Sequence, residues 1–289
     1  MANNQNTKKA NFNWFPGHMK KASIRIEEIQ KFLDFVILII DARVPFSSYN
    51  TFLFDSINNK PKLLLFTKCD LADPILTDKW IKYYESAGFL TYKIDFYDKN
   101  KKKKVVEKLN QIVEPKKQKN LKRGIKHSIF KGVVLGIPNV GKSTLINTLA
   151  SKNLVKAADT PGVTRSVNWI KVNEELYIYD TPGILQPHFE NQEIACKLAL
   201  IGSIRQDILP LEDLTNYLID FLRNNYKIDF DKYLGTDCSI LNNEVIEYLA
   251  KSKVALLKEG KINEEGAVKL LLNDFKDAKI ARATFDLVD

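Results

Sequence analysis

Cysteine is scarce in this sequence, and no apolar run is long enough to cross a membrane. The three cysteines, Cys69, Cys196 and Cys238, lie far apart and show no paired spacing. This argues against a disulfide framework and against a cysteine-rich zinc site. The most apolar run, FVILII at 35–40, is much shorter than the roughly 20 residues of a spanning helix. The opening MANNQNTKKANFN lacks the apolar centre of a secretory signal, so we expect a cytoplasmic protein.

Acidic residues are outnumbered by basic ones, and the imbalance is local. The chain has 44 Lys and Arg against 35 Asp and Glu, a net charge of +9. Residues 99–126 alone hold eleven lysines and one arginine against two glutamates. Such a tract is typical either of a solvated surface helix and linker or of a patch that faces a polyanion. Composition does not decide between these two interpretations.

The first part of the chain alternates strand-like and helix-like segments. Three continuous apolar runs have the composition of buried parallel strands, at 35–41, 62–66 and 129–136. Two segments between them have helical spacing, at 19–33 and 74–87. In the second, the expected apolar face comprises Ile75, Trp80, Ile81, Tyr84 and Ala87. Two further strands joined by a tight turn are predicted at 167–172 and 175–180. The alternation predicts a doubly wound α/β sheet.

The pattern changes after about residue 188. Four segments beyond it have apolar residues at three- and four-residue intervals, at 191–206, 210–223, 242–257 and 263–277. This spacing predicts helices, because it places the apolar side chains on one face of each segment. We therefore predict two domains, 1–188 and 189–289, the second of them helical.

The segment Gly136-Ile-Pro-Asn-Val-Gly-Lys-Ser143 fits the phosphate-loop pattern G-x-x-x-x-G-K-[ST]. It follows an apolar strand and precedes the helical run TLINTLA, which is the context that this motif requires. Its glycines let backbone N–H groups close around a β-phosphate, and the helix N-terminus adds partial positive charge. Lys142 would bridge β- and γ-phosphate oxygens, and Ser143 would offer its hydroxyl to Mg²⁺. The expected phosphate-binding residues are Asn139, Val140, Gly141, Lys142, Ser143 and Thr144.

The tetrapeptide Asp-Thr-Pro-Gly occurs twice, at 159–162 and at 180–183. A γ-phosphate sensor must emerge from the end of a buried strand, and only the second copy follows one. We expect Asp180 to reach Mg²⁺ through a water molecule and the N–H of Gly183 to meet the γ-phosphate. The first copy is then a turn in a loop that presents Thr164 as a second Mg²⁺ ligand.

Selection of the base requires an acid that follows a strand. Thr67-Lys68-Cys69-Asp70 follows the strand-like KLLLF and is similar to the N-K-x-D pattern, with Thr67 in place of Asn. Asp70 would accept hydrogen bonds from guanine N1–H and from the exocyclic amine. Adenine lacks this pair of donors, so the acid selects GTP and argues against an ATPase or a small-molecule kinase. We expect all four residues to form the guanine site.

These elements come in an unusual order, because in ordinary GTPases the base-reading element follows the phosphate loop, whereas here Asp70 precedes Gly136. The same sheet can form only if the chain is circularly permuted, with the basic linker at about 99–126 joining what are normally the two ends. The sensor then leads through Ile184–Glu190 into the helical domain, so a change at Gly183 would tilt that domain. We expect an α/β fold: a circularly permuted P-loop GTPase domain, with a mostly parallel sheet and helices on both faces, followed by an all-α, RNA-binding domain.

Motifs in this permuted order resemble ribosome biogenesis GTPase A, the bacterial YlqF-type family that acts late in assembly of the large ribosomal subunit. The motifs are Trp14-Phe-Pro-Gly-His-Met19, Asp41-Ala-Arg-Val-Pro45, Pro161-Gly-Val-Thr164 and Asp180-Thr-Pro-Gly-Ile-Leu185. The resemblance extends from about residue 12 to Asp274-Phe275-Lys276. It implies hydrolysis of GTP to GDP and phosphate. It also implies the large-subunit precursor, with its rRNA and ribosomal proteins, as the partner.

The resemblance also implies site residues. An ordinary GTPase often carries Gln after the sensor glycine, whereas Ile184 has no polar group. His18 is implied as the catalytic residue, ordered by a bound partner; the alternative is that it is merely exposed on an aromatic arm. Asp95 and Phe96 occupy the place of a base-backing loop, and Asn139 resembles a residue that holds an activating K⁺.

We predict a slow GTPase switch that docks on the immature large subunit in its GTP form and leaves after hydrolysis, which the particle stimulates. One alternative is an RNA-docked placeholder with little turnover. Another is a permuted GTPase for a different RNA particle; the small-subunit type is disfavoured, because only 13 residues precede Trp14 and no Cys/His zinc element is present. Contacts to rRNA are expected from segment 99–126 and from the C-terminal helices, where Lys276, Lys279 and Arg282 fit equally such contacts or a solvated helix face.

Overall fold

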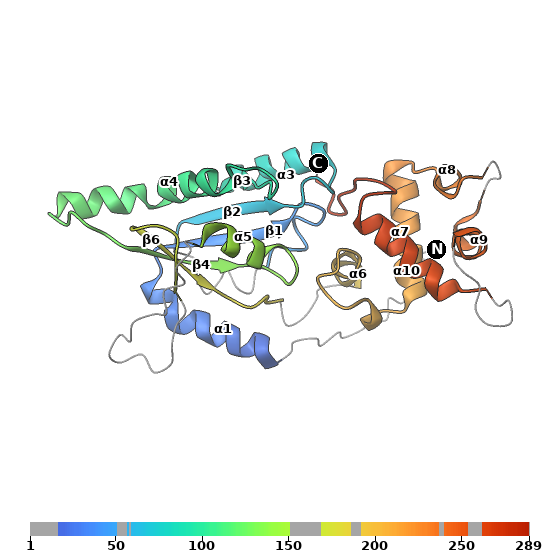
Figure 1. Ribbon diagram of the computed structural model, residues 1–289, viewed down its shortest axis with the longest axis horizontal. Coiled ribbons are helices and arrows are strands. Elements are labelled where there is room, and N and C mark those ends of the chain that lie inside the picture. Colours follow the sequence, from blue (N-terminus) through green and yellow to red (C-terminus); the bar gives the residue numbers. More distant parts are fainter. Residues whose placement is uncertain are drawn as a thin grey trace, which may run out of the picture.

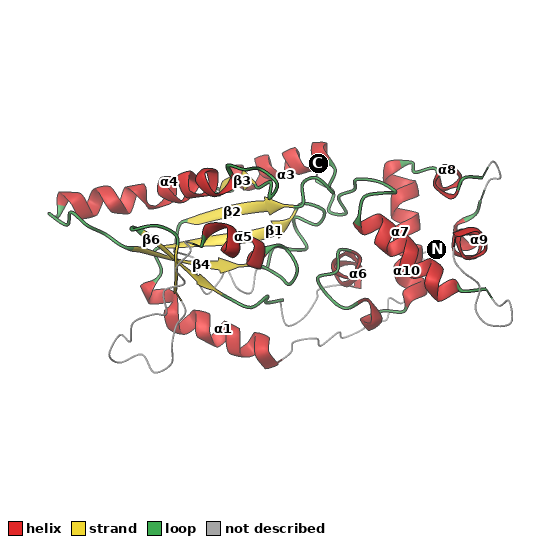
Figure 2. Cartoon of the chain, viewed as in Figure 1, coloured by secondary structure: helices red, strands yellow, loops and turns green. Residues whose placement is uncertain are grey.

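A computed structural model describes residues 17–50, 57, 59–150, 169–185, 192–236, 240–253 and 262–288. A six-stranded sheet with helices on both sides is followed by a region made of helices (Figures 1 and 2). The strands are β1 (Phe35–Asp41), β2 (Lys62–Thr67), β3 (Leu90–Lys93), β4 (Phe130–Leu135), β5 (Trp169–Lys171) and β6 (Leu176–Asp180).

The sheet has the order β3-β2-β1-β4-β6-β5. Neighbouring strands are parallel except for the antiparallel pair of β5 and β6. All residues of β1 are buried, which explains its unbroken apolar run, because a central parallel strand is covered on both faces. Strands β1, β2 and β3 precede the phosphate-loop strand β4 in sequence and yet share its sheet. The predicted permuted order is therefore confirmed.

Helices flank the sheet on both sides: α1 (Gly17–Ile29) with the short 3₁₀ helix η1 (Gln30–Phe32) on one, α3 (Pro74–Ser86) and α4 (Lys101–Lys122) on the other (Figure 1). Helix α5 (Lys142–Leu149) follows the phosphate loop. The Asp73 side chain caps α3 by accepting from the N–H groups of Ile75, at 2.8 Å, and Leu76, at 3.2 Å. Such a cap typically contributes about 1 kcal/mol.

The predicted apolar face of α3 is partly wrong. Ile75 is 71% exposed, whereas Thr77, Trp80 and Tyr84 are buried. Trp80 is five positions after Ile75, which is a rotation of about 140° around a helix of 3.6 residues per turn, so the two cannot share a narrow face. The basic segment is also more ordered than a linker: most of it is α4, which buries Val105, Leu109, Ile112 and Val113.

The helical region comprises α6 (Gln192–Leu200), α7 (Leu211–Tyr226), α8 (Phe230–Leu234), α9 (Val245–Lys253) and α10 (Glu264–Lys276), with the 3₁₀ helices η2 (Gln206–Ile208) and η3 (Asn242–Glu244). The predicted domain boundary at 188 falls outside the described residues and stays a prediction. None of the helices within the described ranges is long and apolar enough to cross a membrane.

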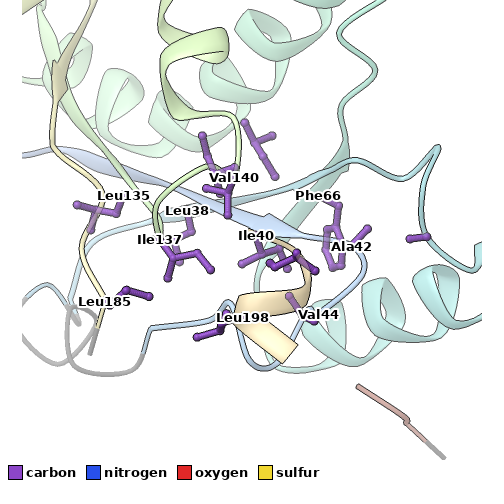
Figure 3. Packing of buried hydrophobic residues seen from close by; sticks show 14 of the residues in the cluster. Leu38, Ile40, Ala42, Val44, Phe66, Leu135, Ile137, Val140, Leu185 and Leu198 are labelled. Carbon is purple, nitrogen blue, oxygen red and sulfur yellow. The ribbon is translucent and has the colours of Figure 1, made fainter. Parts of the chain in front are cut away.

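Buried side chains of the sheet and of the helical region form one continuous cluster. Figure 3 shows Leu198 of α6 beside Ile40 of β1 and Val44 of the turn after β1, with Ile137 of the phosphate loop nearby. Beyond α10, the tail (residues 279–288) returns to the sheet, and Nε1 of Trp80 in α3 donates to the carbonyl of Asp286 at 2.7 Å. The core thus joins the two parts of the molecule at the edge where the parallel strands end.

Candidate nucleotide-binding site

The phosphate loop, Gly136–Ser143, connects the end of β4 to the start of α5. Asn139 and Gly141 have positive φ angles, of 61° and 102°, which turn the backbone sharply before the helix. The Gly141 conformation is one that glycine adopts at no steric cost. The turn directs the N-terminus of α5 into the loop, an arrangement that favours bound anions.

The phosphate loop and the second Asp-Thr-Pro-Gly segment line one hollow of about 380 Å³. Its lining consists of Pro138, Asn139, Lys142, Ser143, Asp180, Thr181, Pro182 and Gly183. Asp180 is the last residue of β6, which pairs with β4 in parallel. The sheet therefore brings five of the residues predicted for phosphate and Mg²⁺ to one hollow, namely Asn139, Lys142, Ser143, Asp180 and Gly183.

Lys142 and Asp180 both line this hollow, and the charge of each affects the pKa of the other. Lys142 is 7% exposed, and its Nζ donates a 2.7 Å hydrogen bond to the carbonyl of Ile137. Burial lowers the pKa of Lys142 to about 8, although Asp180 acts in the opposite direction. Burial likewise raises the pKa of Asp180, opposed by Lys142. A phosphate oxygen would give the buried ammonium a charged partner beside the carbonyl of Ile137.

The segment after Asp180 packs tightly on the phosphate loop. A Cβ atom on Gly183 would lie 2.8 Å from the backbone of Pro138, so only glycine fits here. The N–H of Ile184 donates to the carbonyl of Gly136 at 3.2 Å, and the side chain of Ile184 is fully buried. The residue that follows the sensor glycine is therefore a core residue and presents no polar group to the hollow.

Thr67 connects the base-reading element to the phosphate loop. Its buried hydroxyl lies 2.8 Å from the carbonyl of Val140 and 3.0 Å from that of Ile40, both of which can accept its hydrogen bond. The Thr67 side chain thus links the end of β2 to the phosphate loop, and its predicted contact with guanine stays a prediction.

Lys68 and Asp41 form an ion pair where strands β1 and β2 end. Lys68 Nζ donates to the carbonyl of Asn139 at 2.8 Å and lies 3.2 Å from Asp41 Oδ2. Arg43 contacts the same carboxylate through two hydrogen bonds, of 2.9 and 2.8 Å. Full burial acts to raise the pKa of Asp41, but attraction to Arg43 and Lys68 outweighs it and leaves the pKa below its ordinary value. Asp70, by contrast, is exposed and available to a base.

Of the other predicted guanine-site residues, Phe96 lies close to the phosphate loop. The ring of Phe96 is 3.2 Å from where a Cβ on Gly141 would stand. Asp95 accepts a 2.8 Å hydrogen bond from the N–H of Tyr97 and so shapes the turn after β3. Burial raises the pKa of Cys69 to about 12, so this residue is a neutral thiol that contributes shape rather than charge.

Several predictions fall outside what the structure describes. Thr164 and the first Asp-Thr-Pro-Gly copy lie in 151–168, and His18 stands in the first turn of α1 without a described side chain. The described ranges hold no cluster of three or more His, Cys, Asp or Glu residues suited to a metal. Mg²⁺ in a nucleotide site draws most of its ligands from phosphates and water, so Ser143 and Asp180 fit such an ion.

Contacts between the phosphate loop and the helical region were not predicted from sequence. Asn139 Nδ2 donates to the carbonyl of Gly202 at 2.7 Å, and Ser203 Oγ donates to the carbonyl of Pro138 at 2.9 Å. The pairs are 63 and 65 residues apart in sequence, and no local motif indicates them.

Comparisons with known proteins agree with this geometry. A family model described as RsgA GTPase matches residues 33–190, and one described as 50S ribosome-binding GTPase matches 131–257. Ribosome biogenesis GTPase A of Bacillus pumilus is 36% identical over 94% of this chain and 97% of its own length. The Priestia megaterium protein of that name is 37% identical, over 94% of this chain and 96% of its own.

Solved structures share the fold. GNP-bound YlqF from T. maritima has a TM-score of 0.65 at 24% identity, over 92% of this chain and 97% of that one. A GDP-bound structure of YlqF has a TM-score of 0.66 at 23% identity, over 91% of this chain and 98% of that one. With its permuted sheet, its phosphate loop and relatives that match it over nearly their full length, the chain is a GTPase and belongs to the ribosome biogenesis GTPase A family.

Proposed function

We propose that this GTPase acts in the cytoplasm on the immature large ribosomal subunit. It binds the particle in the GTP form, promotes late assembly, and leaves after hydrolysis. The observation that supports a switch is the pair of hydrogen bonds from Asn139 and Ser203, which join the phosphate loop to the helical region. The relatives' name, ribosome biogenesis GTPase A, supports the ribosomal partner.

In this proposal each side of the hollow has its own task. Lys142 and the N–H groups of Val140–Thr144 hold the β- and γ-phosphates, and Gly183 senses the γ-phosphate. Asp70 reads guanine, while Lys68 and Phe96 flank the base. Ser143, Thr164 and Asp180 hold Mg²⁺, which when bound neutralises charge on the phosphates. A K⁺ ion at Asn139 remains a prediction.

The nucleotide state would reach the helical region through Pro138. Gly183 stands against this residue on one side, and Ser203 donates to its carbonyl. A γ-phosphate that pulls Gly183 inward therefore acts on a loop that α6 and the turn after it already contact. Such a short path is typical of nucleotide switches, in which a small local shift moves a whole element.

The cations of α4 are better placed for RNA than those of the tail. Lys279 is paired with Asp274 at 2.9 Å, and the guanidinium of Arg282 is bonded to backbone carbonyls. Lys119 and Lys122 are exposed in the last turn of α4, and Arg123 and Lys126 are exposed just after it. This end of α4 projects beyond the sheet in Figure 1. Phosphate contacts of this kind supply affinity that falls with salt.

Hydrolysis is proposed to depend on His18, because buried Ile184 presents no polar group to an attacking water. The test is GTP turnover by the wild type and by His18→Ala, with large subunits, with small subunits, or alone, in K⁺ and in Na⁺ buffers. We expect large subunits to raise turnover in the wild type and not in His18→Ala, with GDP affinity unchanged.

Other outcomes of this experiment overturn particular parts of the proposal. Stimulation that survives in His18→Ala removes that residue from catalysis. Tight binding to large subunits without faster turnover favours the RNA-docked placeholder. Stimulation by small subunits alone would make the partner wrong, and equal rates in K⁺ and Na⁺ would remove K⁺.

A further inference from the structure

The tail after α10 runs along the strand ends that carry the base-reading residues. Residues Ala283, Thr284, Phe285 and Asp286 are all buried there. Thr284 Oγ1 donates to the carbonyl of Ala42 at 3.1 Å and accepts from the N–H of Asp73 at 3.2 Å. The N–H of Phe285 donates to the carbonyl of Arg43 at 2.7 Å. The tail is thus fixed in register against the ends of β1 and β2.

The helical region holds the other side of the same tail. Tyr226 of α7 exchanges hydrogen bonds with the backbone of Thr284, at 2.8 and 3.2 Å. The Phe285 ring packs against Phe221, with centroids 4.5 Å apart, and against Phe275, at 5.3 Å. The Asp286 carboxylate accepts from Ser47 at 2.7 and 2.8 Å, and Lys197 of α6 lies 3.1 Å away. These contacts fix the backbone of the tail and therefore the position of the Cα atom of Arg282.

The Arg282 side chain extends from this fixed backbone to the specificity loop, which we define as Thr67–Ala72. Its Nη2 donates to the carbonyl of Cys69 at 2.8 Å, and its Nε donates to that of Ala72 at 3.1 Å. The two carbonyls lie on either side of Asp70 in sequence. A planar guanidinium bonded at both points defines distance and orientation together, as a single flexible ammonium does not.

The specificity loop is held at its start, where the carbonyl of Thr67 accepts from the N–H of Ala42 at 3.0 Å, and Arg282 holds the part around Asp70. It turns at Lys68, whose φ is 55°, and the N–H of Leu71 donates to the carbonyl of Lys68 at 3.0 Å. Asp70 itself is exposed. To accept two hydrogen bonds from one guanine edge, its carboxylate must be held in the plane of the base. A small rotation of the loop would retain one bond and lose the other.

We propose that Arg282 is a positioning residue for guanine selection, which makes the tail part of the nucleotide site. The inference rests on the proposed role of Asp70 as the residue that reads guanine. It goes further in one respect: discrimination between bases depends on a residue more than 200 positions away, and on the helical region that holds that residue in place.

The test compares the affinities of the full chain for GDP and for IDP, whose base lacks the exocyclic amine. We expect Arg282→Ala to weaken GDP binding about tenfold and IDP binding much less, because a misplaced carboxylate loses its second bond. The preference for GDP over IDP should therefore fall at least about threefold. Arg282→Lys, which can bond to one carbonyl, should recover part of it. Lys279→Ala, a nearby cation paired with Asp274, should bind both nucleotides as the wild type does.

The alternatives give different results. If Arg282→Ala lowers both affinities equally, or leaves the preference unchanged, the residue is only structural and the inference is overturned. Thermal unfolding of each variant without nucleotide shows whether the substitution destabilises the whole fold. If Arg282→Ala does so, the base preference of Arg282→Lys decides whether Arg282 positions the specificity loop. Asp70→Asn should abolish the preference; if it does not, the guanine assignment fails and the Arg282 inference fails with it. A preference lost in Asp70→Asn but kept in Arg282→Ala overturns the Arg282 inference alone.

Discussion

The side-chain amide of Asn139 in the phosphate loop donates a 2.7 Å hydrogen bond to the carbonyl of Gly202 in the helical region. Ser203, the next residue, donates to Pro138 at 2.9 Å. Two neighbouring residues of the phosphate loop, Pro138 and Asn139, are therefore hydrogen-bonded to two neighbouring residues of the helical region. A shift of the phosphate loop would therefore either move the turn that follows α6 or break these hydrogen bonds.

Ser203→Ala tests this link without touching the phosphate-binding groups. Loss of one buried hydrogen bond should lower the free energy of unfolding by about 1 kcal/mol. More specifically, hydrogen exchange of residues 192–205 should respond less to a GTP analogue than in the wild type. Ser252→Ala removes an exposed hydrogen bond to Tyr248 and is the matched control. An unchanged exchange response in Ser203→Ala would show that the helical region senses nucleotide by another route.

The lowered pKa of Lys142, about 8, predicts a pH dependence of nucleotide binding. Bound phosphate favours the ammonium, so GDP affinity should fall about five- to tenfold between pH 7 and pH 9, as the free protein loses this proton. Lys142→Ala should bind more weakly and lack this component, while it shares any titration of guanine itself. Parallel profiles for the two proteins would contradict the prediction. Without nucleotide the unfolded chain retains this proton longer, so the Lys142 contribution to stability rises with pH above about 8.

The buried carboxylate of Asp41 should contribute strongly to stability. Asp41→Asn leaves Arg43 and Lys68 without their shared partner, and we expect a loss of about 3–5 kcal/mol in urea unfolding at pH 7. Because folding lowers the pKa of Asp41, its stabilisation is present above the unfolded value of roughly 3.9 and is lost as the pH falls through the lower, folded value. The difference between wild type and variant should therefore stay constant from pH 7 to pH 5. A difference that shrinks across that range would mean that Asp41 is not held ionised.

Ala278, just beyond α10, has a φ of 54°, in the left-handed region. This conformation costs a residue with a Cβ about 1–2 kcal/mol, part of which glycine regains at the expense of a more flexible unfolded chain. Ala278→Gly should therefore raise the free energy of unfolding by about 0.5–1 kcal/mol. Gly124→Ala is the reverse control, because φ of Gly124 is 80° and no described atom lies within 4 Å of the added methyl group. We expect it to lower the free energy of unfolding by about 1 kcal/mol through the backbone strain alone. Destabilisation by Ala278→Gly would show that contacts of the methyl group stabilise the fold by more than the backbone strain costs.

Local patterns predicted much of the fold. The unbroken apolar run of β1 and the phosphate-loop motif each specify a local structure with little tertiary help. The placement of the second Asp-Thr-Pro-Gly copy at the end of β6 followed from the same reasoning. Strand β3 was not predicted, because Leu90–Lys93 is short and only Thr91 is buried in it. Its composition therefore lacks the apolar signal of the central strands.

The contacts that join distant segments could not be predicted from the sequence. Nothing in the residues around Arg282 or Ser203 indicates which carbonyl each will reach, since that depends on how the helical region packs. Thr67 shows the same limit at short range: the sequence places it after an apolar strand, but only the structure shows its hydroxyl turned toward Val140 and Ile40.

The sheet ends on both sides in a short strand, β3 with four residues and β5 with three. An edge strand exposes unpaired N–H and C=O groups to which a strand from another molecule can add, and natural proteins limit this hazard by shortening their edges. The long apolar strand β1 lies between β2 and β4, away from either edge. The backbone of this apolar strand, FVILIID, is thereby kept from pairing with a second copy as long as the sheet stays folded.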